Sequence, residues 1–124
     1  MEYVSTRGEA PALGFSDTVL AGLARDGGLY VPQEWPQFSA QEVRAMRGLP
    51  YPDIAIRVLT PFLGGEIPSA AFEALVREAY ATFRHEAVCP LVQLGPNRFV
   101  LELFHGPTLA FKDVAMQLLA RLMD

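Results

Sequence analysis

One lysine marks the segment whose residue types are best suited to chemistry. Lys112 is the only lysine in the chain, and it follows Phe111 in a largely apolar run, downstream of a His-Gly-Pro-Thr turn at residues 105–108. Thr108 is a residue type that caps helices, so we expect a helix from about Leu109 to the last residue, with Lys112 in its first turns. The positive end of the helix dipole and the apolar neighbours both disfavour a cation there. A neutral amine condenses with aldehydes, which makes Lys112 a candidate for imine chemistry.

A second interpretation of Lys112 stays open on the residues alone. The other nine residues of the lysine and arginine total are arginines, so the position of a single lysine can simply reflect a composition that is poor in lysine. Asp113, the next residue, favours the charged form of the amine because opposite charges attract. The alternatives are therefore a reactive lysine and an incidental one.

The elements that must position Lys112 are a hairpin and a helix. Two apolar runs, at 91–94 and 99–104, flank a Gly-Pro-Asn turn and predict a β-hairpin. The helix that follows is expected to pack through an apolar stripe consisting of Met116, Leu119, Ala120 and Met123.

Upstream of residue 84, the pattern is mostly helical. A short strand is expected at 2–6. A helix capped by Ser16 is expected to end at Asp26-Gly27-Gly28, and an extended piece at 29–31 follows it. Further helices are expected after the Ser39–Glu42 capping box, over 52–63 with Pro61 bending or ending it, and beyond the Gly64-Gly65 break. The last has the clearest stripe: Phe72, Leu75, Val76, Ala79, Tyr80 and Phe83. The predicted fold is α/β, a mostly helical part followed by a hairpin and a helix, with the seam within 84–90.

Composition excludes several classes of function. The 124 residues are 51% apolar, and the net charge of -4 is spread without basic or acidic blocks, so we expect neither a nucleic-acid nor a membrane partner. No run approaches the ~20 apolar residues of a membrane span, and the N-terminus does not resemble a secretory signal. Cys89 stands alone with only two histidines in the chain, so no metal site is expected, and a reducing compartment, the cytoplasm, is favoured.

Three segments resemble the threonine synthase family. They are YVSTRG at residues 3–8, LARDGGLYVP at 23–32 and ELFHGPTLAFKD at 102–113, in the order and at the spacing typical of that family. Several matched segments across most of a chain are a more specific signal than one short motif. The resemblance implies a pyridoxal-phosphate enzyme of the tryptophan-synthase-β-like class.

The resemblance also implies roles for particular residues. Lys112 matches the lysine that holds pyridoxal 5'-phosphate as a Schiff base, in an enzyme that converts O-phospho-L-homoserine and water into L-threonine and phosphate. Lys112 would release the cofactor to the substrate and then shuttle protons at the substrate's α and β carbons. Phe111 would form an apolar wall beside the cofactor; the alternative is an ordinary core phenylalanine.

Five further residues have two interpretations each. His105 either takes part in the site or only holds the turn, and Thr108 either contacts ligand or only caps the helix. Ser5, Thr6 and Arg7 either face a phosphate group, which suits hydroxyls and a guanidinium, or brace the N-terminal strand.

The resemblance assigns the two parts of the chain to two domains. Residues 1–88 would be the N-terminal domain of the family and residues 89–124 the start of the cofactor-binding domain. The glycine- and serine-rich loop that grips the cofactor phosphate is expected after the lysine segment, so we expect a fragment that is inactive alone. The rival hypotheses are a non-catalytic interaction module with this fold, and another pyridoxal-phosphate lyase such as a dehydratase or a cysteine synthase.

Overall fold

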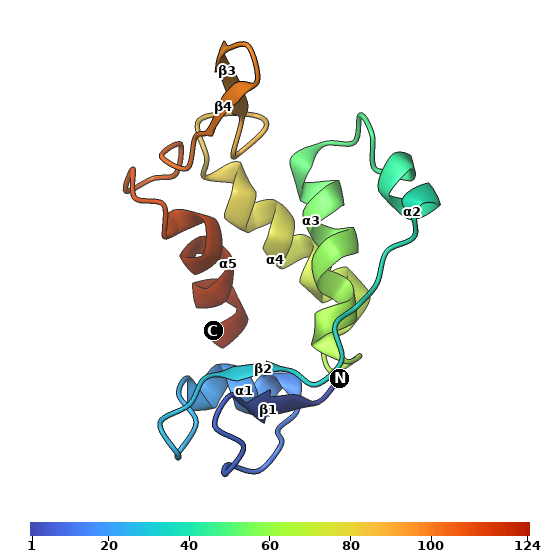
Figure 1. Cartoon of the computed structure of the whole chain (residues 1–124), viewed down its shortest axis with the longest axis vertical. Coiled ribbons are helices and arrows are strands. Elements are labelled where there is room, and N and C mark those ends of the chain that lie inside the picture. The colour runs from blue at the N-terminus through green and yellow to red at the C-terminus, as the bar shows by residue number, and fades with distance from the viewer. The chain divides into compact units, whose positions relative to one another are not determined.

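The computed structural model describes residues 1–124 and forms two compact units. Unit 1 consists of Met1–Arg47 and Ile56–Phe72, and unit 2 of Gly48–Ala55 and Glu73–Asp124. Helices α3 (Tyr51–Leu59) and α4 (Ser69–Ala81) contribute residues to both units. The chain combines five α-helices and a short 3-10 helix with two small sheets, which agrees with an α/β class (Figure 1). The domain boundary at residue 88 stays a prediction.

Unit 1 begins with a short antiparallel ribbon. Strand β1 (Tyr3–Ser5) pairs with β2 (Tyr30–Pro32), so that Tyr3 lies opposite Pro32. Both strands lie where β-favouring residues predicted extended structure. The Tyr3 side chain is buried, and its hydroxyl donates a hydrogen bond of 2.8 Å to the Phe62 carbonyl. This bond ties the ribbon to the segment that follows α3.

Helix α1 (Phe15–Ala21) departs from the prediction at both ends. Ser16 does not cap it. Instead, the Glu66 carboxylate accepts hydrogen bonds from the backbone amides of Phe15 at 2.7 Å and Ser16 at 2.9 Å. The helix ends at Gly22 with φ 66°, before the expected Asp-Gly-Gly stop, because glycine reaches the left-handed conformation without steric cost.

The remaining helices of unit 1 follow their local signals. Helix α2 (Ala40–Ala45) begins with the predicted capping box: Glu42 N donates to Ser39 Oγ at 3.2 Å, and Ser39 N donates to the Glu42 carboxylate at 2.7 Å. Helix α3 ends before Pro61, and the 3-10 helix η1 (Thr60–Leu63) continues the chain. Both predictions are confirmed, since each depends on residues within four positions.

The α4 stripe supplies several of the buried apolar side chains. Phe72, Val76, Ala79 and Tyr80 are all buried, as the helical spacing predicted. In unit 2, the Tyr80 ring meets the Tyr51 ring edge-on, with centroids 4.9 Å apart. Val88 is also buried at 2% exposure. Val76, Ala79, Tyr80 and Val88 thus form part of the buried core of unit 2.

The predicted hairpin is confirmed. Strands β3 (Leu91–Gly95) and β4 (Arg98–Leu101) pair antiparallel around Pro96 and Asn97 (Figure 1). Strand β4 ends at Leu101, earlier than the predicted residue 104. Large apolar side chains are exposed on both strands, among them Leu91, Leu94, Phe99 and Leu101.

Helix α5 (Asp113–Met123) begins later than predicted and buries a different face. Met116 and Met123 of the expected stripe are 49% and 55% exposed, whereas Leu118 is 7% exposed. The expected stripe is wrong because Val114, Leu118 and Leu122 also recur at helical spacing, and residues on that side of α5 contact α4, as the bond of 3.0 Å from Arg121 to Glu78 also shows. The Tyr80 hydroxyl donates to the Val114 carbonyl at 3.2 Å. None of the helices has the length and apolar character that a membrane crossing requires.

Candidate active site

Lys112 lies at an apolar hollow of unit 2. It immediately precedes α5, with φ -60° and ψ -25°, and its side chain is exposed. The hollow, here called the Lys112 hollow, has a volume of about 480 Å³ and is lined by Leu103, Phe111, Lys112, Val114, Ala115 and Met116. A primary amine is therefore presented at a mostly apolar concave surface, the kind of surface that binds small molecules.

One expectation about this segment is wrong. Lys112 is not in the first turns of a helix that starts near Leu109, because α5 begins only at Asp113. Its side chain is exposed, although the residues that line the hollow beside it are mostly apolar. Phe111 is 66% exposed within these 124 residues. Its aromatic surface is available beside the amine.

Thr108 contacts Asp113 and does not cap a helix. The Thr108 amide donates to Asp113 Oδ2 at 2.8 Å, and the Thr108 hydroxyl lies 2.9 Å from both carboxylate oxygens. We call these bonds the Thr108–Asp113 clasp. Asp113 is only 3% exposed. A threonine in a turn was read as a cap because caps and turns use the same side-chain hydrogen bonds.

The backbone inside the clasp is tightly packed and partly strained. A Cβ at Gly106 would lie 2.5 Å from Asp113 Oδ2 and 2.7 Å from Asp113 Cγ, so only glycine fits. Leu109 has φ 64°, a conformation that is unfavourable for a residue with a side chain. The clasp therefore holds a turn that its own sequence does not favour.

His105 joins the turn to its neighbours. Its Nε2 lies 2.7 Å from the Glu102 carboxylate, and its carbonyl accepts a hydrogen bond from the Arg84 amide at 2.9 Å. Its ring lies 5.1 Å from that of His85 and 4.6 Å from that of Phe104. These contacts favour the interpretation that His105 holds the turn.

In unit 1, Asp26 connects the two N-terminal segments. Desolvation alone would raise the pKa of the Asp26 carboxyl, but hydrogen bonds from Gly28 N, Ser5 Oγ, Glu9 N and Ala10 N together lower that pKa. The bonds to Gly28 and Ser5 are 2.8 Å long, and those to Glu9 and Ala10 are 3.0 Å. Sequence reasoning missed this role because it read Asp26 only as part of a helix end.

The hydroxyls of the first segment are occupied by the same network. Ser5 is buried and donates to Asp26, and the Thr6 hydroxyl accepts a bond of 3.0 Å from the Leu29 amide. Arg7 Nη1 donates to the Asp26 carbonyl at 3.0 Å, while its side chain is largely exposed. For Ser5 and Thr6 these contacts favour the bracing interpretation over a phosphate-facing one.

Cys89 is not set up as a nucleophile. Burial raises the pKa of its thiol, which outweighs the opposing hydrogen bond with Tyr51. A higher pKa leaves less thiolate at neutral pH. Burial also raises the pKa of the Tyr51 hydroxyl beside it.

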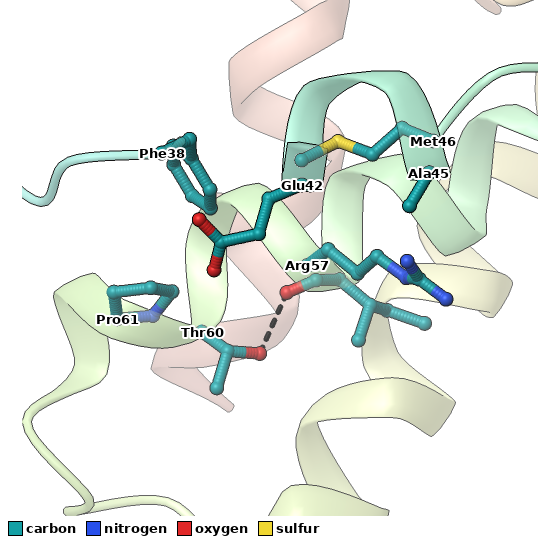
Figure 2. A pocket seen from close by; sticks show the side chains of 8 residues that line it. Phe38, Glu42, Ala45, Met46, Arg57, Thr60 and Pro61 are labelled. Carbon is teal, nitrogen blue, oxygen red and sulfur yellow. Dashed lines mark hydrogen bonds between the residues drawn. The ribbon is translucent and has the colours of Figure 1, made fainter. Parts of the chain in front are cut away.

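A second hollow, of about 510 Å³, lies in unit 1 between α2 and the end of α3 (Figure 2). Phe38, Met46 and Pro61 give it an apolar lining. Its polar groups are largely committed: Glu42 serves the capping box, and the Thr60 hydroxyl donates to the Ile56 carbonyl at 2.6 Å. No base–nucleophile pair lies in it, so it offers less chemistry than the Lys112 hollow.

Comparison with known proteins gives consistent results. A family model described as threonine synthase N terminus matches residues 2–80. A threonine synthase of Pseudomonas aeruginosa is 58% identical over 124 residues, which are 100% of this chain and 26% of that protein. The crystal structure of a PLP-bound threonine synthase from Brucella melitensis matches with a TM-score of 0.96 and 76% identity, over 99% of this chain and 26% of that one. The threonine synthase structure from yeast matches with a TM-score of 0.90 and 39% identity, over 98% and 25%.

This chain spans about a quarter of the length of the relatives that it matches. The family model, by contrast, covers well over half of the chain itself. On that match, the chain belongs to the family described as threonine synthase N terminus.

Proposed function

We propose that this chain is the N-terminal part of a pyridoxal-phosphate-dependent threonine synthase, in which Lys112 carries the cofactor. The enzyme converts O-phospho-L-homoserine and water into L-threonine and phosphate. One observation supports this most strongly: the chain's single lysine is presented at an apolar hollow, in a chain 76% identical to a PLP-bound threonine synthase.

The residues present fit the cofactor. An exposed primary amine can condense with its aldehyde, and the exposed Phe111 ring can cover an aromatic ring beside it. When bound, the cofactor draws electrons away from the substrate's α carbon. The Lys112 amine would hold the cofactor and, when free, would take the proton from the substrate's α carbon and move protons at the β carbon.

We further infer the domain organisation and location of the enzyme. Residues 1–88 form its N-terminal domain, and residues 89–124 begin the cofactor-binding domain. The exposed apolar side chains of β3 and β4 support the second assignment, because such surfaces are usually covered by further protein. Its partner is a small-molecule substrate, and the single, unpaired Cys89 supports a reducing cytoplasmic location.

A chimera tests the proposed activity directly. This chain replaces the matching N-terminal 26% of the Brucella melitensis enzyme, and release of phosphate and L-threonine from O-phospho-L-homoserine is measured. We expect turnover close to that of the Brucella enzyme, and none from the Lys112→Ala chimera, which lacks the amine. A chimera that folds and binds the cofactor but releases no phosphate would contradict the proposal and favour a non-catalytic module.

A further inference from the structure

We propose that Asp113 is a positioning residue for Lys112, an inference that rests on the proposed function. Its carboxylate fixes the turn at residues 106–112, and that turn sets the direction in which the Lys112 side chain leaves the backbone. Asp113 itself touches neither substrate nor cofactor in this role.

The environment of Asp113 is unusual for an acid. The residue is 3% exposed, yet no arginine, lysine or histidine forms an ion pair with it. A buried carboxylate without a cation is unfavourable unless hydrogen bonds compensate. The Thr108 amide and hydroxyl supply them at 2.8 and 2.9 Å, and the Gln117 amide adds a longer contact of 3.5 Å. Every one of these donors comes from the turn or from α5.

The turn held by these bonds contains a strained residue and a close contact. Leu109 adopts φ 64°, which an unconstrained leucine avoids. Gly106 packs so closely on Asp113 that a methyl group would overlap it. The turn has two backbone hydrogen bonds of its own, from Leu109 N to Gly106 O at 3.2 Å and from Asp113 N to Ala110 O at 3.0 Å, and the clasp adds the side-chain contacts that help to keep it in place.

Lys112 is fixed from both sides of this arrangement. Its carbonyl accepts hydrogen bonds from Ala115 N at 3.1 Å and Met116 N at 2.8 Å, which anchors it to α5. On the other side, the Thr108–Asp113 clasp anchors the turn that leads into it. Since Lys112 and Asp113 are adjacent, a change in the clasp rotates the backbone from which the amine extends.

Thr108→Val tests the inference in the active chimera. Valine keeps the shape of threonine and the amide bond to Asp113 but removes the hydroxyl. A misplacement of about 1 Å can lower a rate about 100-fold, so we expect kcat to fall about 10- to 100-fold with little change in KM. Thr108→Ser, which keeps the hydroxyl, should restore kcat. The midpoint pH of the absorbance change of the bound cofactor should also shift in Thr108→Val and return in Thr108→Ser.

Two further variants separate positioning from stability. Asp113→Ala removes the whole clasp and should lower kcat further than Thr108→Val, provided that it folds. Val76→Ala weakens the core far from the turn in sequence and should leave both kcat and the midpoint pH unchanged at a temperature where the chimera stays folded. Equal kcat and midpoint pH in Thr108→Val and the unsubstituted chimera would overturn the inference. That result would leave the proposed function intact, because the proposed function is contradicted by a different result: activity of the Lys112→Ala chimera, or a folded chimera that binds the cofactor but releases no phosphate.

Discussion

Replacing Gly106 by alanine tests the packing on which the Lys112 segment depends. The substitution adds a single methyl group at a buried position where the backbone is not left-handed, so the dihedral angles of alanine are not at issue. The new Cβ would lie 2.5 Å from Asp113 Oδ2 and 2.7 Å from Asp113 Cγ. Favourable contacts between heavy atoms begin near ~3.5 Å, so the overlap is about 1 Å and the turn has to move.

The expected cost follows from two opposing terms. Overpacking of a tight site costs about 1–3 kcal/mol. Against this, alanine restricts the unfolded chain more than glycine and stabilises by about 0.4–1 kcal/mol. Taking the middle of both ranges, the free energy of unfolding should fall by about 1 kcal/mol, which corresponds to a drop of roughly 3–6 °C in Tm.

Gly95→Ala is the matched control in the same unit. Gly95 also has no left-handed backbone, and its new Cβ would come no closer than 3.4 Å to the flexible side chain of Arg98. We expect a change within about 0.5 kcal/mol. Thermal and urea unfolding followed by circular dichroism measure both variants. If Gly106→Ala were as stable as Gly95→Ala, the close packing of Gly106 on Asp113 would be wrong, and so would the clasp.

Three further outcomes are expected. Val76→Ala, at a fully buried site, should lower the free energy of unfolding by about 2–3 kcal/mol in urea titrations, whereas Val43→Ala, 57% exposed, should change it by less than about 0.5 kcal/mol. Hydrogen bonds from Ser16 and Phe15 lower the pKa of the Glu66 carboxyl below its ordinary 4.5. The contribution of Glu66 to the free energy of unfolding is therefore present above pH 4.5 and is lost as the pH falls through the lowered pKa. The urea midpoint should drop less between pH 7 and pH 3 in Glu66→Gln than in the exposed control Glu34→Gln. Phe111→Ala should leave the free energy of unfolding of this chain unchanged because the ring is 66% exposed. It should weaken cofactor binding in absorbance titrations of the chimera, and unchanged binding would remove Phe111 from the proposed site.

Local signals in the sequence predicted much of the fold. The Ser39–Glu42 capping box, the end of α3 before Pro61 and the hairpin at 91–101 each depend on residues a few positions apart. The α4 stripe was also predicted, because one side of that helix is clearly more apolar than the other. Predictions of this kind succeed where neighbours in sequence decide the outcome.

The predictions were wrong where contacts with other elements of the fold, or with a partner outside the local pattern, determine the structure. Glu66 caps α1 from 50 positions away, so Ser16 was wrongly assigned that task. Two apolar sides compete on α5, and the contacts with Tyr80 and Glu78 of α4 select the one that the stripe had not predicted. Thr108 was read as a cap although its partner is the carboxylate five residues later.

For the candidate site, the sequence identified the lysine but not its supports. Lys112 and Phe111 stand out by residue type and by resemblance, and the structure places both at one hollow. The structural roles of Asp113 and Asp26 were not predicted, because a carboxylate that accepts hydrogen bonds from backbone amides produces no pattern in a single sequence. The glycines next to their partners, at 28 and 106, were the available signal.

The attachment site of the cofactor distinguishes Lys112 from every other amine of the chimera. The chimera is incubated with pyridoxal phosphate, reduced with borohydride, digested with trypsin and analysed by mass spectrometry. We expect the cofactor mass on Lys112, in a peptide covering residues 99–121, because trypsin does not cleave after a modified lysine and the flanking cleavages follow Arg98 and Arg121. Lys112→Arg should remove both this label and the visible absorbance of the bound cofactor. Label on another lysine, or an absorbance band that persists in Lys112→Arg, would contradict the account.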